Sequence, residues 1–202
     1  MTTMKQTSRV LFLILGASMS LAACLSPSGG SNEARRDDVL EMRSDVLAEL
    51  YRLVPEARSE IDTAEGYGVF SNVGVHIIFA SLGNGYGVVE DNSSGERTYM
   101  RMLSAGLGFG LGIKDFRGIF VFTRRRALEN FIERGWDASA QADIAAKSGD
   151  RGGAFAGAFD VAQGIRLYQI TEAGLAIQAT IQGTKYWRDD DLTSRSATLT
   201  GP

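Results

Sequence analysis

Hydrophobic positions change their spacing along this chain, and the change divides it into a helical first part and a strand-rich second part. From Glu33 to Val54 apolar side chains recur three and four residues apart, with charged residues between them, which predicts an amphipathic helix. Pro55 ends this helix, and because proline is tolerated in a first turn it is well placed to open a second short helix through Ala64. The polar face of the first helix mixes acids and bases, so we expect it to pack on a domain core rather than lie on a membrane.

From Gly66 onward the pattern is that of strands, rich in Val, Ile, Phe and Tyr and separated by Gly, Asn and Ser. Turn-forming residues predict a hairpin loop at Glu90–Glu96 and a turn at Thr171–Gly174. Strands are predicted at Tyr67–Phe70, Val73–Ala80, Tyr86–Glu90, Arg97–Gly112, Gly118–Phe122, Ile165–Ile170 and Leu175–Ile181.

One helix is predicted to interrupt these strands. It begins within Thr123–Arg126, ends at Gly135, and turns one apolar face inward (Ala127, Leu128, Phe131 and Ile132). A further helix is predicted near Ala138–Ala146. The fold class that follows is α+β, in which an N-terminal helix packs on a curved, mainly antiparallel sheet that approaches a barrel, with helices inserted after Phe122. The chain shows no repeat of the length that makes a solenoid.

Glycines stand at every second position in two of the predicted strands: Gly83, Gly85 and Gly87, and Gly106, Gly108, Gly110 and Gly112. Alternate side chains of a strand point to opposite faces, so one face of each strand is bare backbone. A bare strand is weak by itself, and we expect either another segment of the chain or a ligand to pack closely on it. A phosphate-binding loop does not fit, because position 111 is Leu and no P-loop lysine follows.

The start of the chain has the layout of a secretory signal peptide. Lys5 and Arg9 precede an apolar run, which is shorter than the roughly 20 residues that span a bilayer. The segment Leu21-Ala22-Ala23-Cys24 resembles a bacterial lipobox. The resemblance implies a diacylglyceryl thioether on Cys24, cleavage before it, and a further acyl chain such as palmitate on the new N-terminus. An ordinary secretory signal that ends near a cysteine is the alternative.

Four segments follow from this assignment: a signal peptide at 1–23, a lipidated N-terminus and flexible tether at 24–32, a domain at 33–192 and a polar tail at 193–202. Leu25, rather than Asp, follows the cysteine. In the sorting scheme of Gram-negative lipoproteins this resemblance favours the outer membrane. We therefore expect the domain at the periplasmic face of that membrane, in the cell envelope.

Charge and composition narrow the possible functions. The chain has 21 basic and 24 acidic residues, and loss of residues 1–23 with Lys5 and Arg9 leaves 19 against 24, which changes the net charge from −3 to −5. Such a chain is poorly suited to binding nucleic acid. With Cys24 acylated no thiol remains, and the single histidine, His76, lies in an apolar strand, where a structural role is the expectation. We therefore expect no enzymatic activity, no metal and no cofactor beyond the covalent lipid on Cys24.

Two polar clusters are candidates for binding. Arg124, Arg125 and Arg126 lie where a helix begins, and free backbone N–H groups with three guanidinium groups would suit a phosphate or lipid headgroup. The alternative is a solvated face on which Arg125 pairs with Glu129. The segment Tyr186–Asp191 could join an interfacial aromatic to a calcium-binding set of acids, but it lacks the spacing of a calcium loop, so an aromatic anchor at the end of the domain is favoured.

The order of glycine–aromatic blocks resembles the SYLF domain over about Ala48 to Trp187. The blocks are Ala64–Gly74, Gly83–Val88, Ser104–Gly110 and Gly183–Trp187. Eukaryotic SYLF domains bind phosphoinositides and, in yeast, join actin patches, whereas bacterial members are commonly small lipoproteins of unsettled function. A bacterial envelope offers neither actin nor ordinary phosphoinositides, so the resemblance implies a fold and a tendency to bind anionic lipid.

Three functions are therefore compared. The first is a non-enzymatic, membrane-anchored lipoprotein whose domain binds anionic phospholipid headgroups through Arg124, Arg125 and Arg126. The second is a structural lipoprotein that binds another envelope protein through its glycine-bare strands. The third is an enzyme, which the scarcity of the usual catalytic residues disfavours.

Overall fold

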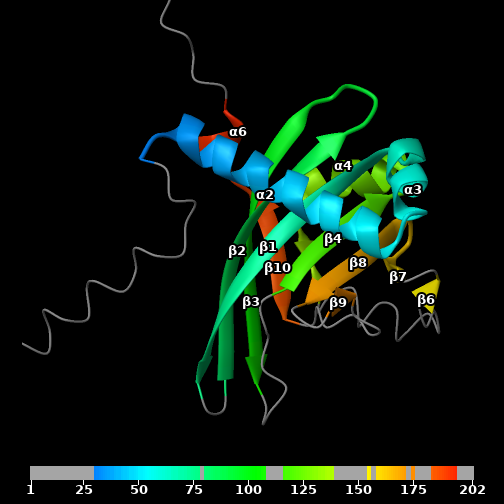
Figure 1. The fold of residues 1–202 in the computed structure, drawn as a ribbon. Helices are drawn as coiled ribbons and strands as arrows, with labels where there is room; N and C mark the ends of the chain where they lie inside the picture. The colour runs from blue at the N-terminus through cyan, green and yellow to red at the C-terminus, as the bar shows by residue number, and fades with distance from the viewer. Residues whose placement is uncertain are drawn as a thin grey trace, which may run out of the picture.

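The computed structural model describes residues 30–77, 80–107, 116–138, 154–155, 158–171, 174–175 and 183–194, and these form an α+β fold around one antiparallel sheet (Figure 1). The helices in these residues are α2 (Asn32–Leu53), α3 (Ala57–Thr63), α4 (Arg125–Arg134) and α6 (Asp190–Thr193). The strands are β1 (Gly66–Ile77), β2 (Ala80–Asp91), β3 (Arg97–Leu107), β4 (Phe116–Phe122), β5 (Trp136–Asp137), β6 (Ala154–Phe155), β7 (Ala158–Ala162), β8 (Ile165–Thr171), β9 (Gly174–Leu175) and β10 (Thr184–Arg188).

Several expectations lie outside the described residues. These are the signal peptide, Cys24 and most of the tether, the helix near Ala138–Ala146 beyond its first residue, the glycines at 108, 110 and 112, the strand beyond Leu175, and the tail after Ser194.

The first helix forms as the hydrophobic spacing predicts. Ser31 caps it, because its hydroxyl oxygen accepts a hydrogen bond from the Ala34 N–H at 3.2 Å. Its buried face carries Val39, Val46 and Leu50. The second helix begins two residues later than predicted, at Ala57, because Pro55 and Glu56 form a turn. No helix in the described ranges is long and apolar enough to span a bilayer.

The sheet order is β5-β10-β3-β2-β1-β4-β8-β7-β6, with β9 paired to β8, and every pairing is antiparallel. The prediction of two strands at Tyr67–Phe70 and Val73–Ala80 was wrong, because β1 is continuous. Ser71 and Asn72 interrupt the hydrophobic pattern but remain in register with β2. The buried Asn72 side chain accepts a hydrogen bond from the Ser104 hydroxyl at 3.1 Å, which compensates part of the cost of its burial.

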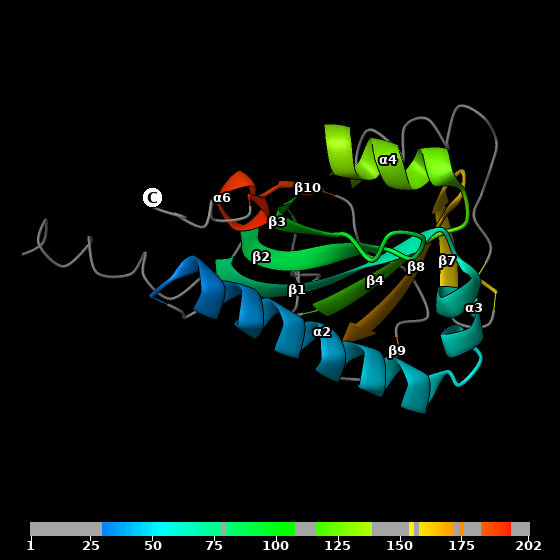
Figure 2. The ribbon, with the colours of Figure 1, turned by 90° about the horizontal axis from the view of Figure 1, so that it is seen from above.

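Two helices cover opposite faces of this sheet: α2 lies across the outer face and α4 across the inner face (Figure 2). The sheet is strongly curled. Phe70 on β1 and Tyr186 on β10 are three strand spacings apart, about 14 Å in a flat sheet, yet their ring centroids are 4.8 Å apart. The predicted curved, antiparallel α+β fold is therefore confirmed, as a half-barrel.

Two main hydrophobic clusters hold these layers together. On the inner face an aromatic group packs beneath α4 (Phe70, Phe120, Phe122, Phe131, Trp136 and Tyr186). On the outer face α2 and α3 cover a second group (Val46, Leu50, Ile61, Val69, Ile119, Val121 and Tyr168). The helix predicted after Phe122 is α4, which ends at Gly135 with φ at +71°, as expected for a glycine stop.

The bare face of β2 at Gly83, Gly85 and Gly87 is closely covered by the chain itself. A Cβ on Gly87 would overlap the carbonyl oxygen of Val69 and the ring of Phe70, and one on Gly85 would overlap the carbonyl oxygen of Ser71 and the Met102 side chain. Internal packing rather than a ligand groove is therefore confirmed at these positions.

Candidate functional site: an arginine-lined hollow

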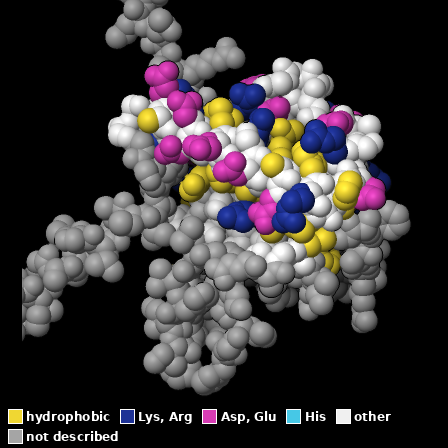
Figure 3. Space-filling model, viewed as in Figure 1, with side chains coloured by type: hydrophobic (Ala, Val, Ile, Leu, Met, Phe, Trp, Pro, Cys, Tyr) yellow, Lys and Arg dark blue, Asp and Glu magenta, His cyan; other side chains and the backbone are white. Residues whose placement is uncertain are grey.

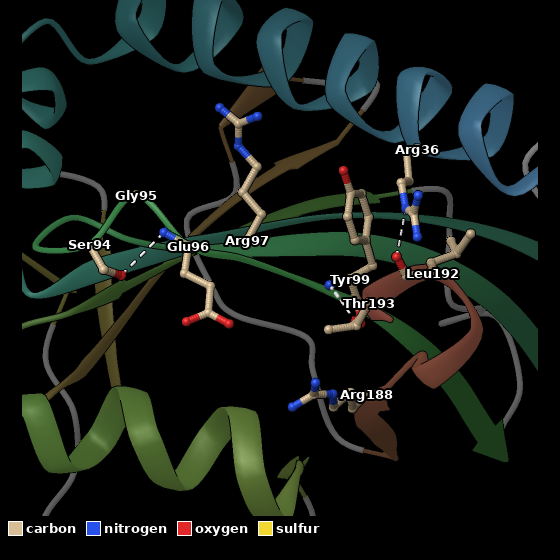
Figure 4. Close-up of a pocket in the computed structure, with 9 residues that line it drawn as sticks. All are labelled: Arg36, Ser94, Gly95, Glu96, Arg97, Tyr99, Arg188, Leu192 and Thr193. Carbon is tan, nitrogen blue, oxygen red and sulfur yellow. Dashed lines mark hydrogen bonds between the residues drawn. The ribbon is translucent and has the colours of Figure 1, made fainter. Parts of the chain in front are cut away.

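A hollow of about 730 Å³ lies at the edge of β3 between the β2–β3 hairpin loop, the start of α2 and the C-terminal helix α6 (Figure 4). Its lining brings together residues from five separate elements: Arg36, Ser94, Gly95, Glu96, Arg97, Tyr99, Arg188, Leu192 and Thr193. The charged residues of this lining are thus three arginines and one glutamate. None of the three belongs to the predicted group at 124–126.

The diagonal path of α2 places its arginines at this hollow. Val39 on α2 packs on Val88 and Tyr99, which are paired residues of β2 and β3. On the same helix, Arg36 reaches toward α6 and the Tyr99 ring, and Arg43 forms an ion pair with Glu90 at the end of β2. The helix therefore presents a basic flank to the hollow, although acidic side chains gather over its first half when it is viewed from outside (Figure 3).

Arg36 is held by neutral groups. Its Nε donates to the Leu192 carbonyl at 2.7 Å and its Nη2 to the Ser194 carbonyl at 2.6 Å. The guanidinium carbon also lies 6.0 Å from the centroid of the Tyr99 ring, within cation–π range. Among the described residues no carboxylate pairs with Arg36, so its positive charge is not neutralised there.

The other two arginines are only partly neutralised. Arg97 Nε donates to Glu90 at 2.8 Å, and this hydrogen bond raises the arginine's pKa above its usual value. The same Glu90 oxygen also binds Arg43, so two guanidinium groups share one carboxylate. Arg188 lies 3.3 Å from Asp190, a side chain that is 89% exposed, so solvent screens this pair strongly. The hollow is therefore locally positive.

Helix α6 closes the hollow and is fastened at several points. Asp189 caps α6 by accepting from the Leu192 N–H at 3.2 Å, and it also accepts from Arg101 Nε at 2.7 Å. Thr193 Oγ1 accepts from the Tyr99 N–H and donates to the Tyr99 carbonyl, both at 3.1 Å. Burial raises the pKa of Tyr99, so its phenol stays neutral at pH 7.

This arrangement is suited to holding an anion. Guanidinium groups match carboxylate and phosphate oxygens in geometry and charge. Within the described part of the chain no group of three His, Cys, Asp or Glu side chains could hold a metal ion. The lining is therefore chemically suited to attract a negatively charged group.

The predicted arginine cluster lies on the other side of the same hairpin loop. Arg125 binds Asp91 at 2.5 Å and Glu129 at 3.0 Å, so the predicted pairing with Glu129 is confirmed. The Arg124 side chain covers Gly164 in the β7–β8 turn, and Arg126 is exposed. An anion site at Arg124, Arg125 and Arg126 stays a prediction, and in this structure Arg125 serves to fasten α4 to the loop.

Asp91 organises that loop, and its replacement by asparagine gives a pH-dependent prediction. Its carboxylate accepts from Arg125 and from Ser93 N–H at 2.9 Å, and the Arg125 bond is the main cause that holds its pKa well below the ordinary 3.8. Because the folded-state pKa is the lower one, this stabilisation is complete above pH 3.8 and is lost as the pH falls through the folded-state value.

We therefore expect Asp91→Asn to unfold at lower urea concentration than the parent at neutral pH, with the two curves converging in strong acid. Asp37→Asn, at an exposed position of α2, serves as the control and should not change the pH dependence. A difference between Asp91→Asn and the parent that stayed constant from neutral pH to strong acid would contradict this role.

The remaining sequence candidates fall elsewhere. Position 76 lies in β1, and the structure does not describe its side chain. Tyr186 is an aromatic anchor as expected, because it is 1% exposed in the inner cluster. Sequence reasoning missed Arg36, Arg97 and Arg188 because they are far apart in the chain and only the fold brings them together. The spacing of charged residues along α2 was the one sequence pattern that could have pointed to this site.

The fold and the hollow together define an α+β half-barrel with a basic recess. Comparison of the sequence with known proteins adds one relative. No protein-family model matches the chain. The chain is 32% identical over 157 residues to Beta cell expansion factor A of Aeromonas veronii, and the match covers 77% of this chain and 58% of that protein. The matching part of this chain thus spans little more than half the length of its relative.

Proposed function

We propose that this chain is a non-enzymatic, membrane-anchored envelope lipoprotein whose folded domain binds the anionic headgroups of phospholipids in the arginine-lined hollow. The hollow is the observation that carries the proposal, because Arg36, Arg97 and Arg188 all line it and are only partly neutralised. Headgroup phosphates are the anions that a domain tethered to a membrane meets at the highest local concentration.

Two features of the sequence support an attachment to the membrane. The lipobox-like segment that ends at Cys24 would supply an acyl anchor, and Ser31, where α2 is capped, lies seven residues further on. At up to 3.6 Å per residue this tether reaches about 25 Å. The start of α2, and with it the hollow, would therefore stay close to the periplasmic face of the outer membrane.

Membership of the SYLF family is part of the same proposal. The glycine–aromatic blocks support it, and three of them now have a structural role: Gly66–Gly74 forms most of β1, Gly83–Val88 lies in β2, and Thr184–Trp187 lies in β10. The Aeromonas relative supports a common fold over most of the chain. Binding of anionic lipid is the property that we carry over from the resemblance.

The direct test uses the chain from Gly30 onward, which lacks Cys24 and so cannot bind by acylation. All described members of the three hydrophobic clusters lie between Val39 and Leu192, so this part retains every core residue that the structure describes. We expect it to float with phosphatidylglycerol vesicles at low salt and to be released at high salt, because surface electrostatics are screened within a Debye length. Phosphatidylcholine vesicles are the neutral control.

Failure to bind anionic vesicles at low salt, in a protein whose circular dichroism confirms folding, would contradict the proposal. Cys24 would then be the sole membrane contact. The second candidate function, a structural lipoprotein that binds another envelope protein, would replace it, and three exposed apolar side chains favour that candidate (Leu82, Leu103 and Trp187).

A further inference from the structure

The outer face of the sheet continues past α2 and is not covered there by another described helix. Register places successive pairs of β2 and β3 along this face: Val88 with Tyr99 beneath α2, then Tyr86 with Arg101, Asn84 with Leu103, and Leu82 with Ala105. On β10, Trp187 lies beside Arg101 and Lys185 beside Leu103. We call this uncovered part of the outer face the floor. Large apolar side chains are exposed on it, with Leu82 at 55%, Leu103 at 46% and Trp187 at 38%.

One flank of α2 forms an acidic wall beside this floor. Asp38 contributes electrostatically to the raised pKa of Tyr86, after burial, which places Asp38 on the floor side of the helix. Glu41 and Asp45 follow three and seven residues later, so they extend the same side of the helix. In Figure 3 the acidic side chains over α2 run beside hydrophobic ones. We call the floor and this wall together the open face.

The charges that remain available on the open face are negative. Each basic side chain of the floor has an acidic partner: Arg101 binds Asp189 at 2.7 Å, and Lys185 lies 3.8 Å from Asp137. Asp38, Glu41 and Asp45, in contrast, make no ion pair with any residue that the structure describes. Like charges at this helical spacing cost a few tenths of a kcal/mol each, so the wall lowers the stability of α2.

The dimensions of the floor fit one helix laid beside α2. Successive pairs are about 7 Å apart along a strand, so the floor extends roughly 20 Å from the Val88–Tyr99 pair to the Leu82–Ala105 pair. Packed helices lie about 8–10 Å apart. A second helix parallel to α2 would therefore rest above the Tyr86–Arg101 and Asn84–Leu103 pairs, with one side against the acidic wall and Leu82 at its far side.

From these observations we infer that the open face is a docking surface for a cationic amphipathic helix of a partner protein or peptide. Apolar residues of that helix would cover Leu82, Leu103 and Trp187, and its lysines or arginines would pair with Asp38, Glu41 and Asp45. An anionic bilayer is disfavoured as the occupant because the wall would repel it. This surface is separate from the arginine-lined hollow, so the two proposals succeed or fail independently.

The fluorescence of Trp187 provides the readout of binding to the open face. The chain has two tryptophans, and the other, Trp136, is only 6% exposed. We would titrate the chain from Gly30 onward with a synthetic helical peptide that carries leucines on one face and lysines on the other. The expected result is a blue shift of the Trp187 emission, absent in Trp187→Phe, and no binding of the matched peptide with glutamate in place of lysine.

Variants locate the contact. Leu82→Ser with Leu103→Ser, and separately Asp38→Asn with Asp45→Asn, should each weaken peptide binding roughly tenfold or more. The control pair Asp62→Asn with Glu133→Gln removes two exposed acids elsewhere and should leave the affinity within about twofold.

Three results would overturn the inference: no binding of the lysine peptide, equal weakening by the control pair, or a protein dimer that the leucine substitutions dissociate. The last would assign the face to a second copy of the chain. Neither test pair should weaken flotation with anionic vesicles, which separates this result from failure of lipid binding.

Discussion

Replacing Gly87 with alanine is expected to lower the free energy of unfolding by about 3 kcal/mol, at the upper end of the usual cost of overpacking. The cause is steric, because the added methyl group would overlap the Val69 carbonyl oxygen on the neighbouring strand and the ring of Phe70. The backbone of β1 would have to move away from β2, which would strain the ladder between them. Urea unfolding followed by circular dichroism measures the effect.

Gly118→Ala is the matched control for this prediction. Gly118 is also a buried glycine in a strand, on β4, but the atom nearest to the place of an added methyl group is Leu167 Cδ1 at 3.5 Å, an ordinary contact. We expect this variant to change the free energy of unfolding by less than about 1 kcal/mol. Equal destabilisation by the two substitutions would mean that glycine's flexibility, rather than close packing, determines both positions.

Replacing Phe120 with alanine is expected to cost about 4 kcal/mol of unfolding free energy, which is typical for loss of a buried phenylalanine. Phe120 is fully buried at the centre of the inner cluster, with ring centroids 5.7 Å from Phe70, 5.4 Å from Trp136 and 5.1 Å from Tyr186. Its removal would leave a cavity and remove several edge-to-face contacts, each worth about 0.5–1.5 kcal/mol.

The comparison for Phe120→Ala is Leu103→Ala, which removes an apolar side chain from the exposed floor and should cost no more than about 0.5 kcal/mol. Chemical denaturation of both variants gives the difference. A small effect at Phe120 would mean that the aromatic cluster rearranges to fill the space and that the curl of the sheet does not depend on this ring.

The amphipathic helix, the helix that Gly135 ends and the central strands were predictable from spacing, because each alternates or repeats over a full element. The continuity of β1 was not, because Ser71 and Asn72 look like a break until Ser104 on another strand supplies a hydrogen-bond partner. The short strands β5, β6 and β7 were missed because two to five residues carry too little periodicity.

The candidate site was less predictable than the fold. A cluster of three consecutive arginines is visible in a sequence, but the ion pairs of Arg125 with Asp91 and Glu129 depend on where the hairpin loop lies. The hollow, in contrast, needs α2, β3 and β10 to meet before Arg36, Arg97 and Arg188 line one recess. Long-range contacts of this kind leave no local pattern along the chain.

The most direct measurement is flotation of the chain from Gly30 onward with phosphatidylglycerol vesicles, comparing two pairs of charge-neutralising substitutions. Arg97→Gln with Arg188→Gln removes two positive charges from the hollow, and Arg124→Gln with Arg126→Gln removes two from the start of α4. A basic residue near an anionic membrane contributes about 1 kcal/mol, so we predict that the hollow pair weakens binding about thirtyfold while the α4 pair changes it little. The reverse result would contradict the hollow as the lipid site and return it to Arg124, Arg125 and Arg126.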